Sequence, residues 1–336
     1  MEETLDKMKN FATYSETFSS LDALARGYMA SRIFLTALEL SVFEQLGTRQ
    51  LTAAQIAQEL KADAKAMEVL LNALAGMRLL KKQDNMFTNC KESEDLLIPS
   101  SPNYRGGAFH HIANLWASWS HLTETVKSGQ TLNRRWTNKM KLDLSLIMQE
   151  QAKVRADKLA RVIDCSNAAR MLDIGGGPGA YAVAFARCCP NLKIDCFDRD
   201  NQALKLAGEE IARHGLADRV SLKKGDFFTD EIGSDYDLVL LSSIVCLFGE
   251  DENILLFSKV KKALKDGGRA VVWDVLLDEQ KTQPSFAAIF AVNMLVNTRH
   301  GRLYNISEIK DLLGRAGFKD IFIIPVSSST AIVGRV

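Results

Sequence analysis

The chain has 336 residues, of which 47% are hydrophobic and 25% are charged, a composition that is typical of a folded globular protein with about two domains. Its 42 basic and 41 acidic side chains leave a formal charge of +1. This balance argues against a partner that attracts the whole protein by charge, such as nucleic acid or a membrane surface.

Targeting and cysteine usage point to the same kind of protein. Residues 1–6 are acidic and precede no apolar run of signal-peptide length, and no later apolar stretch is as long as a membrane-spanning helix. We therefore predict a cytoplasmic protein. The six cysteines show no C-x-x-C pair and no regular spacing with the histidines, so we expect no metal site and no disulfides. These cysteines are Cys90, Cys165, Cys188, Cys189, Cys196 and Cys246.

The first predicted domain, residues 1–105, is mainly helical. Apolar residues at helical spacings predict helices over 18–46 and 64–77, and the pattern Thr52 to Gln55 predicts a capping box at the start of a helix over 51–60. A short hairpin over 79–88 completes a winged-helix pattern. Only Lys65 and Arg78 supply cations near the third helix, whereas DNA contacts need several. The pattern therefore favours dimer packing over DNA binding.

A helical linker is predicted over residues 106–168. Its segment 109–121 is dense in aromatic and imidazole groups, namely His110, His111, Trp116, Trp119 and His121. Aromatic faces with a few polar tips are typical of pockets for flat rings, so this segment is a candidate wall for an acceptor pocket; the alternative is interdomain core. Met148, in a helix predicted over 142–163, is expected to cover the cofactor. Asn293 and Met294 complete the predicted acceptor pocket.

The third predicted domain, residues 169–336, begins with a glycine-rich turn between a strand and a helix. Gly175, Gly177 and Gly179 permit a tight turn and close approach of a ligand to the backbone. Asp173, two residues before Gly175, suits a cationic ligand group rather than a pyrophosphate. Asp198 ends the next strand and is placed to bind ribose hydroxyls. This order of acid, glycines and acid favours S-adenosylmethionine (SAM), which carries two cationic groups and no phosphate, over NAD.

Strands and helices then alternate, which predicts a doubly wound, Rossmann-like α/β sheet. Strands are expected over 170–174, 192–197, 220–224, 238–242, 270–275, 321–325 and 331–335, with helices between the first five and over 306–316. Asp226 and Phe227 follow the third strand, and Ser242 ends the fourth, all at the edge that carries the glycines. We expect them to bind the adenosyl group. The alternative is that Phe227 packs in the core and Asp226 caps a helix.

These motifs together resemble the class I SAM-dependent methyltransferases. With the winged-helix front domain, the chain is more narrowly similar to the caffeate and hydroxyindole O-methyltransferase family and its bacterial relatives. The motifs are Leu172-Asp-Ile-Gly-Gly-Gly-Pro-Gly, Phe197-Asp198, Gly225-Asp-Phe-Phe, Lys262-Ala-Leu-Lys-Asp-Gly-Gly268, Val272-Trp-Asp274 and Ala316-Gly-Phe318. The resemblance implies an intertwined homodimer and methyl transfer from SAM to a small, aromatic, hydroxylated acceptor.

The chain departs from that family at its catalytic base. The family places a histidine after the fourth strand, in a His-Asp-Trp tripeptide, where this chain has Cys246, Leu247 and Phe248. The supporting glutamate of the family corresponds to Leu303. A phenol with a pKa near ~10 needs a base, and the sequence does not distinguish between the candidates, which are His300, His110, His111, His121 and Cys246.

Three functions therefore remain open from the sequence. The first is O-methylation of an aromatic acceptor, with C- or N-methylation of a small molecule as its close alternative. The second is a SAM-binding dimer that lacks methyl transfer, which the loss of both base residues makes conceivable. The third, a winged-helix DNA binder, is disfavoured by the small number of cations.

Overall fold

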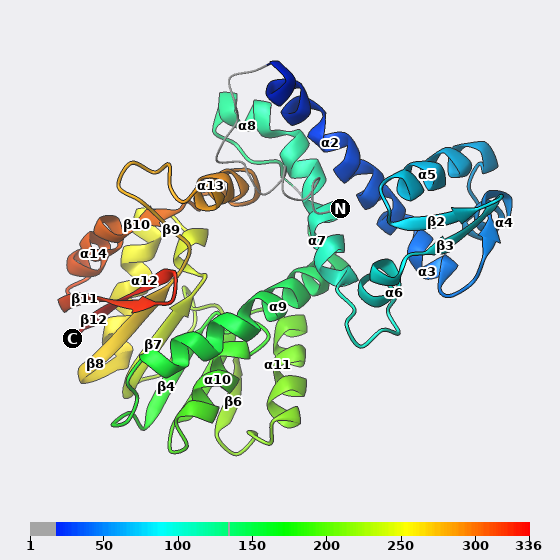
Figure 1. Ribbon diagram of the computed structural model, residues 1–336. Helices are drawn as coiled ribbons and strands as arrows, with labels where there is room; N and C mark the ends of the chain where they lie inside the picture. The colour runs from blue at the N-terminus through cyan, green and yellow to red at the C-terminus, as the bar shows by residue number, and fades with distance from the viewer. Residues whose placement is uncertain (1–17, 134) are drawn as a thin grey trace. The chain divides into compact units, whose positions relative to one another are not determined.

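The computed structural model describes residues 18–133 and 135–336. The acidic residues 1–6, on which the prediction of no signal peptide rests, lie outside the described residues. The chain divides into two compact units, one ending at Trp116 and the other beginning at Ala117. Figure 1 draws both units. The three-part division at residues 105 and 168 stays a prediction. No helix within the described ranges is long and apolar enough to cross a membrane.

The first unit packs short helices around a three-stranded sheet in the order β1-β3-β2. The predicted capping box is confirmed, because Thr52 N–H donates to Gln55 Oε1 (2.8 Å) and Gln55 N–H donates to Thr52 Oγ1 (3.3 Å). Its elements are α2 (Phe18–Glu39), α3 (Val42–Leu46), β1 (Leu51–Thr52), α4 (Ala53–Leu60), α5 (Ala64–Gly76), β2 (Leu80–Gln83), β3 (Met86–Asn89) and α6 (Lys91–Leu97), followed by α7 (Gly106–Ser120), which crosses the division at Trp116.

The prediction of one helix over residues 18–46 is wrong at its C-terminal end. Helix α2 ends at Glu39, and Ser41 has a left-handed backbone with φ of 58°. This turn redirects the chain so that Val42, Phe43 and Leu46 of α3 are each at most 1% exposed. Burial of these three side chains outweighs the continuous helical pattern of the sequence.

The second unit is built on the predicted seven-stranded sheet, in the order β11-β12-β8-β7-β4-β5-β6, with β12 antiparallel to both of its neighbours. The strands are β4 (Arg170–Ile174), β5 (Lys193–Asp198), β6 (Val220–Lys224), β7 (Tyr236–Ser242), β8 (Leu264–Trp273), β11 (Lys319–Val326) and β12 (Ser329–Arg335), and β9 (Leu276–Leu277) pairs with β10 (Tyr304–Asn305) in a separate ladder. The Rossmann-like fold is confirmed.

Helices cover both faces of this sheet (Figure 1). Successive strand residues point to opposite faces, and Met171 and Leu172 accordingly belong to different core clusters. The first cluster includes residues of α9, α10 and α11, and the second includes residues of α12 and α14. The helices are α8 (Leu122–Ser128), α9 (Asn138–Val162), α10 (Ala180–Cys188), α11 (Asn201–Arg213), α12 (Glu250–Ala263), α13 (Ser285–Asn297) and α14 (Ile306–Arg315), with the 3-10 turn η1 (Val245–Leu247).

One predicted helix is absent, between the third and fourth strands of the alternation. The chain from 225 to 235 instead forms turns, in which Asp226 Oδ1 accepts the N–H of Phe228 (2.9 Å) and the Asp226 carbonyl accepts the N–H of Asp230 (2.8 Å). An aspartate that bonds the backbone two residues later favours a turn over a helix. This local bond explains why the apolar residues in the segment do not form a helix.

The prediction that all six cysteines are reduced is wrong for two of them. Cys165 and Cys189 form a disulfide, with their Cα atoms 6.5 Å apart and a sequence separation of 24. One follows α9 and the other follows α10, and both helices pack together at the same face of the sheet. Pairing of this kind depends on tertiary packing, so the sequence spacing did not indicate it.

Candidate functional site

The glycine loop lies at the carboxyl ends of the parallel strands β4 and β5. The carbonyl of Phe197 accepts the N–H groups of Gly175 (2.8 Å) and Gly176 (3.2 Å), which ties the loop to the end of β5. Gly175 has φ of +63°, and a Cβ there would lie 2.1 Å from Ile244 Cδ1. Conformation and close contact therefore both require glycine at this position.

Asp173 lies beneath this loop with its carboxylate enclosed by protein. The residue is 1% exposed, and neither carboxylate oxygen has a hydrogen-bond partner among the described residues. Burial, together with the neighbouring charge of Asp198, raises the pKa of Asp173 to about 7. A buried acid without a partner is costly and is stabilised by a cation. The carboxylate thus fits a ligand that carries a positive group, as SAM does.

Asp198 is held at the end of β5 by two backbone bonds. Its Oδ2 accepts the N–H of Gly177 (2.9 Å), and its Oδ1 accepts the N–H of Asp200 (2.8 Å). Burial raises the pKa of Asp198, and these two hydrogen bonds oppose the rise. Each carboxylate oxygen can accept more than one hydrogen bond. The fixed carboxylate therefore retains acceptor capacity for a pair of hydroxyl groups.

The remaining predicted cofactor residues lie at the same edge of the sheet, in different environments. Phe227 is 9% exposed and packs with Phe228 and Phe248, with ring centroids 4.9 and 5.7 Å away. It is a core residue, as one alternative predicted, whereas Asp226 caps a turn rather than a helix and lies 3.5 Å from an Arg199 nitrogen. Ser242, 8% exposed, ends β7 opposite Trp273. Their contact with an adenosyl group stays a prediction.

The two positions that hold the base and its supporting acid in similar enzymes are apolar here and belong to one cluster. Cys246 (4% exposed) and Leu303 (3%) pack in a cluster with Leu277, Ala287 and Met294. Burial, and then the charge of Asp274, raises the pKa of the Cys246 thiol well above its usual range. A neutral thiol is a poor proton acceptor. The site of the familiar base is thus occupied by a hydrophobic contact.

Two further residues, Asp274 and Tyr181, lie at this edge of the sheet. The sequence did not predict either of them as a site residue. Asp274, 3% exposed, accepts the N–H groups of Cys246 (3.1 Å) and Val275 (2.8 Å). The Tyr181 hydroxyl accepts the indole N–H of Trp273 (3.1 Å), and the Arg155 guanidinium lies 5.3 Å from the Trp273 ring centroid. Asp274 follows a parallel strand at its carboxyl end, so the rule that selected Asp226 applies to it equally.

The second unit brings part of the predicted acceptor pocket together. Trp119 donates its indole N–H to Asn293 Oδ1 (3.1 Å), and Met294, 6% exposed, packs in the cluster of Cys246. Met148 lies half-buried in α9, and His121 is exposed just before α8. These contacts place Trp119 and α13 in one structural unit with the glycine loop. Their contact with an acceptor stays a prediction.

The other predicted residues of segment 109–121 belong to the first unit. Trp116 packs against the core of that unit, with the Arg32 guanidinium 5.4 Å from its ring centroid. His111 is 8% exposed and His110 is half-buried. Trp116 thus has the core contacts that the alternative predicted. A role of these three residues toward an acceptor stays a prediction.

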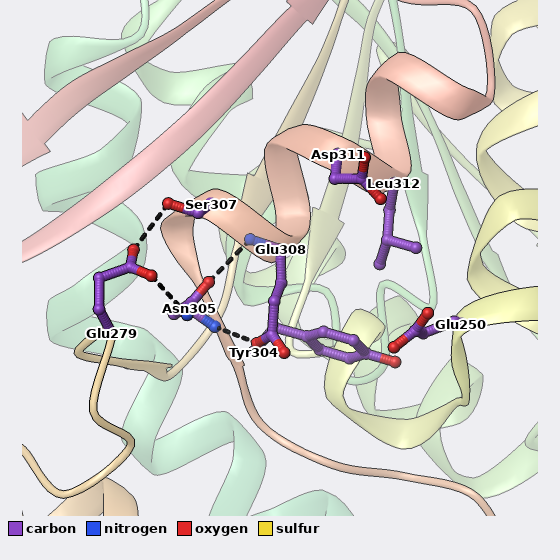
Figure 2. A pocket seen from close by; sticks show the side chains of 8 residues that line it. All are labelled: Glu250, Glu279, Tyr304, Asn305, Ser307, Glu308, Asp311 and Leu312. Carbon is purple, nitrogen blue, oxygen red and sulfur yellow. Dashed lines mark hydrogen bonds between the residues drawn. The ribbon is translucent and has the colours of Figure 1, made fainter.

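A pocket of about 300 Å³ lies beside α14, and none of its lining residues belongs to the glycine loop (Figure 2). The pocket is lined by acidic side chains, but these already have partners within the protein. Glu279 accepts from Asn305 Nδ2 (2.9 Å) and Ser307 Oγ (2.7 Å), and Asn305 and Glu308 form a capping box at the start of α14. Arg302 pairs with Glu250 (3.0 Å) and also with Glu308. These bonds anchor the chain that follows His300.

The sequence matches two families over adjoining stretches. Residues 23–98 match the O-methyltransferase dimerisation domain, and residues 119–319 match the O-methyltransferase domain. The second match alone spans more than half of the chain. The first match lies within the predicted dimerisation domain, and the second covers most of the predicted helical linker and most of the predicted methyltransferase sheet domain.

Individual relatives agree with the family match. The chain is 30% identical to 3-hydroxy-5-methyl-1-naphthoate 3-O-methyltransferase of Streptomyces sahachiroi, covering 93% of this chain and 92% of that protein. It is 28% identical to acetylserotonin O-methyltransferase of Gallus gallus, covering 88% and 91%. Its fold is similar to that of PigF with SAH (TM-score 0.86, 25% identity, covering 95% of this chain and 100% of PigF).

It is also similar to the human N-acetylserotonin methyltransferase in complex with SAM (TM-score 0.77, 25% identity, covering 96% of this chain and 98% of that one). The glycine loop, the buried acid beneath it and the acid at the end of β5 are the features from which the sequence predicts a SAM site. The chain therefore belongs to the O-methyltransferase family, and its activity is the SAM-dependent transfer of a methyl group.

Proposed function

We propose that the protein methylates a hydroxyl group on a small aromatic acceptor, and that it acts as a homodimer. The observation that carries the acceptor class is the hydrogen bond from the Trp119 indole to Asn293, which sets an aromatic ring and an amide on α13, the helix whose Met294 packs in the cluster of Cys246. The named substrates of the relatives, a hydroxynaphthoate and acetylserotonin, support the same class.

When bound, SAM supplies an electrophilic methyl group on a positively charged sulfur. We infer that Asp173 binds its ammonium group, that Asp198 accepts from its ribose hydroxyls, and that Gly175 and Gly177 present backbone to it. Asp226, Phe227 and Ser242 complete the adenosyl side. The protein then acts mainly by aligning the acceptor with the donor and excluding water.

The dimer is proposed to form through the winged helix of the front domain, residues 1–105. Leu21, Leu24 and Tyr28 of α2 are 58%, 47% and 55% exposed, which is unusual for apolar side chains on consecutive turns of one helix. The match to a dimerisation domain supports this assignment. A cytoplasmic location stays a prediction, which cell fractionation tests.

A panel of naphthols, hydroxyindoles and catechols, incubated with SAM labelled on its methyl group, tests the acceptor class. We expect label in the O-methylated product, identified by mass spectrometry. Label on carbon or nitrogen instead would establish the alternative reactions. SAM binding without label transfer to any compound would favour the SAM-binding dimer, for which the apolar pair Cys246 and Leu303 is the specific reason.

Asp198→Ala tests the cofactor assignment directly. This change removes two charge-assisted hydrogen bonds to the ribose, so SAM binding should weaken by on the order of 2–5 kcal/mol in calorimetry. Asp195→Ala is a suitable control, because Asp195 lies on the same strand but pairs with Lys223 (2.7 Å). Equal SAM affinity of the Asp198→Ala variant and the parent protein would show that the assignment of Asp198 is wrong.

A further inference from the structure

The segment that carries His300 packs directly against the turn that follows β7. A Cβ at Gly301 would lie 2.6 Å from the carbonyl oxygen of Cys246 and 3.0 Å from the carbonyl carbon of Leu247. These distances leave no room for a side chain, so the two backbones are in contact at this point. His300 immediately precedes this contact in the chain, and its Cβ lies 3.4 Å from the position of a Cβ at Gly249.

The same turn also contacts the glycine loop. Ile244 begins it, and the Ile244 side chain fills the space where a Cβ at Gly175 would be. Residues 244–247 therefore bridge Gly175 on one side and Gly301 on the other. The backbone of the segment that carries His300 is therefore linked through residues 244–247 to the proposed cofactor loop.

The imidazole of His300 is oriented by a carboxylate. His300 Nδ1 lies 3.1 Å from Glu252 Oε2 on the first turn of α12, and the same oxygen accepts the N–H of Gly249 (2.9 Å). The bond from the Gly249 N–H thus fixes the position of the Glu252 carboxylate. In the neutral imidazole, the Nδ1–H group donates a hydrogen bond to this carboxylate, and Nε2 is then the unprotonated nitrogen. The His300 side chain is 53% exposed and therefore accessible to a small molecule.

We propose that His300 is the general base of the methyl transfer and that Glu252 is its positioning residue. This inference rests on the proposed function. The acceptor O–H bond breaks, its proton forms a bond to Nε2 of His300, and the freed oxygen lone pair forms the new bond to the methyl carbon as the C–S bond breaks and its electron pair stays on sulfur. Glu252 stabilises the resulting imidazolium.

Compared with similar enzymes, the histidine and the carboxylate have exchanged places between the segment after β7 and the segment that contains Leu303. The histidine lies in the segment just before Leu303, and the carboxylate lies in the helix that follows Cys246. Arg299 and Arg302 are charged neighbours of His300 along the chain, and Arg302 is paired with Glu250 and Glu308. Glu252 is thus the acid that contacts the imidazole, while the nearby Glu250 is bonded to Arg302.

His300→Asn is the decisive variant, because an asparagine amide keeps a donor near the position of Nδ1 and removes the second nitrogen. With a phenol of pKa near ~10, we expect kcat to fall by roughly 10²–10⁴-fold and the acidic limb of the kcat/KM profile to disappear. SAM affinity in calorimetry should not change. With a nitrophenol that is already ionised at the assay pH, the loss should be less than about tenfold, since no proton remains to be removed.

Two further variants separate catalysis from structure. Imidazole added to the buffer should restore activity to His300→Ala. Glu252→Gln should lower kcat less than His300→Asn does, and only with the weakly acidic phenol, because it leaves both ring nitrogens in place and removes the carboxylate that orients them. The matched control is His214→Asn, since His214 pairs with Glu210 (3.2 Å) at the end of α11 and should leave the rate unchanged.

Full activity of His300→Asn on the weakly acidic phenol would overturn the assignment of His300 and leave the proposed function intact. Equal losses on the phenol and on the nitrophenol would also overturn it, because they indicate a structural role. If the parent protein transfers no methyl group to any compound of the panel, the proposed function fails, and this inference fails with it.

Discussion

The thiol of Cys246 is enclosed by α13 and by the chain around Leu303, and its environment disfavours the thiolate. We expect Cys246→Ala to retain methyl transfer within about tenfold of the parent, because a neutral, buried thiol contributes packing rather than proton removal. Steady-state kinetics on a phenolic acceptor measure this. A loss of kcat above about a hundredfold, with SAM affinity intact, would instead identify Cys246 as the base.

Asp173 makes folding stability depend on pH. Its folded pKa of about 7 lies above the ordinary value of 3.8, so the folded protein without ligand retains a proton that the unfolded chain has already lost. Stability is therefore highest below about pH 4 for this group and falls as the pH rises toward 7, by up to about 1.4 kcal/mol for each pH unit.

Asp173→Asn should remove this fall, because the amide is neutral at every pH in that range. In denaturant unfolding without ligand, the variant should be more stable than the parent at pH 8 and close to it at pH 4. Although the variant should be more stable at pH 8, it should bind SAM more weakly, because the ionised carboxylate is lost. An unchanged slope of stability against pH would show that Asp173 is ionised in the folded protein.

The sequence predicted residues whose role follows from the end of a strand, and it missed those whose role follows from packing. Asp173 and Asp198 were predicted as ligand residues because an acid beside a glycine turn has few structural purposes, and the structure places both at the glycine loop. Phe227 packs in the core, and its contact with a ligand stays a prediction, since apolar residues at a strand end serve either purpose. The ion pair of His300 with Glu252 joins residues 48 positions apart, which no local pattern reveals.

At the scale of elements, the contact between the glycine loop and the turn after β7 is testable through Gly175. Gly175→Ala adds a methyl group in a left-handed conformation and against Ile244, whereas Gly177→Ala has a similar φ but meets only the Gly175 carbonyl at 3.9 Å. We expect Gly175→Ala to lower the free energy of unfolding by about 1–3 kcal/mol more than Gly177→Ala.

Chemical denaturation of both variants measures this difference. Ile244→Val removes the Cδ1 that lies closest to the added methyl, so the double variant should recover part of the loss. Additive effects of the two changes would show that the loop and the turn are not coupled at this contact.

Elements with a strong period were predicted to within a few residues, including β4, β6, α5 and α14. The failures have local physical causes. The helical pattern over 18–46 contains no proline or glycine next to Ser41 that would predict its left-handed conformation. The turn at Asp226 depends on one side chain that accepts a hydrogen bond from the backbone two residues later. The disulfide between Cys165 and Cys189 needs two helices to pack before its sulfurs meet.

For the whole molecule, the exposed apolar residues of α2 predict a change in assembly. The double change Leu24→Asp and Tyr28→Asp places two charges on this surface, which should shift a dimer to monomer at micromolar concentration. Light scattering measures the mass. Leu255→Asp, at a 56% exposed position of α12 in the second unit, is the control and should stay dimeric. A monomeric parent protein would contradict the proposed dimer.

The disulfide encloses more than a pair of helix ends. Between Cys165 and Cys189 run β4 with Asp173, all of the glycine loop and all of α10, so the proposed cofactor loop sits inside a closed covalent ring. A protease that cuts the backbone within this ring leaves the two pieces tethered, and they separate on a gel only after reduction. In a nicked protein the disulfide would thus keep the two borders of the proposed ligand loop covalently joined, and reductant would remove that link.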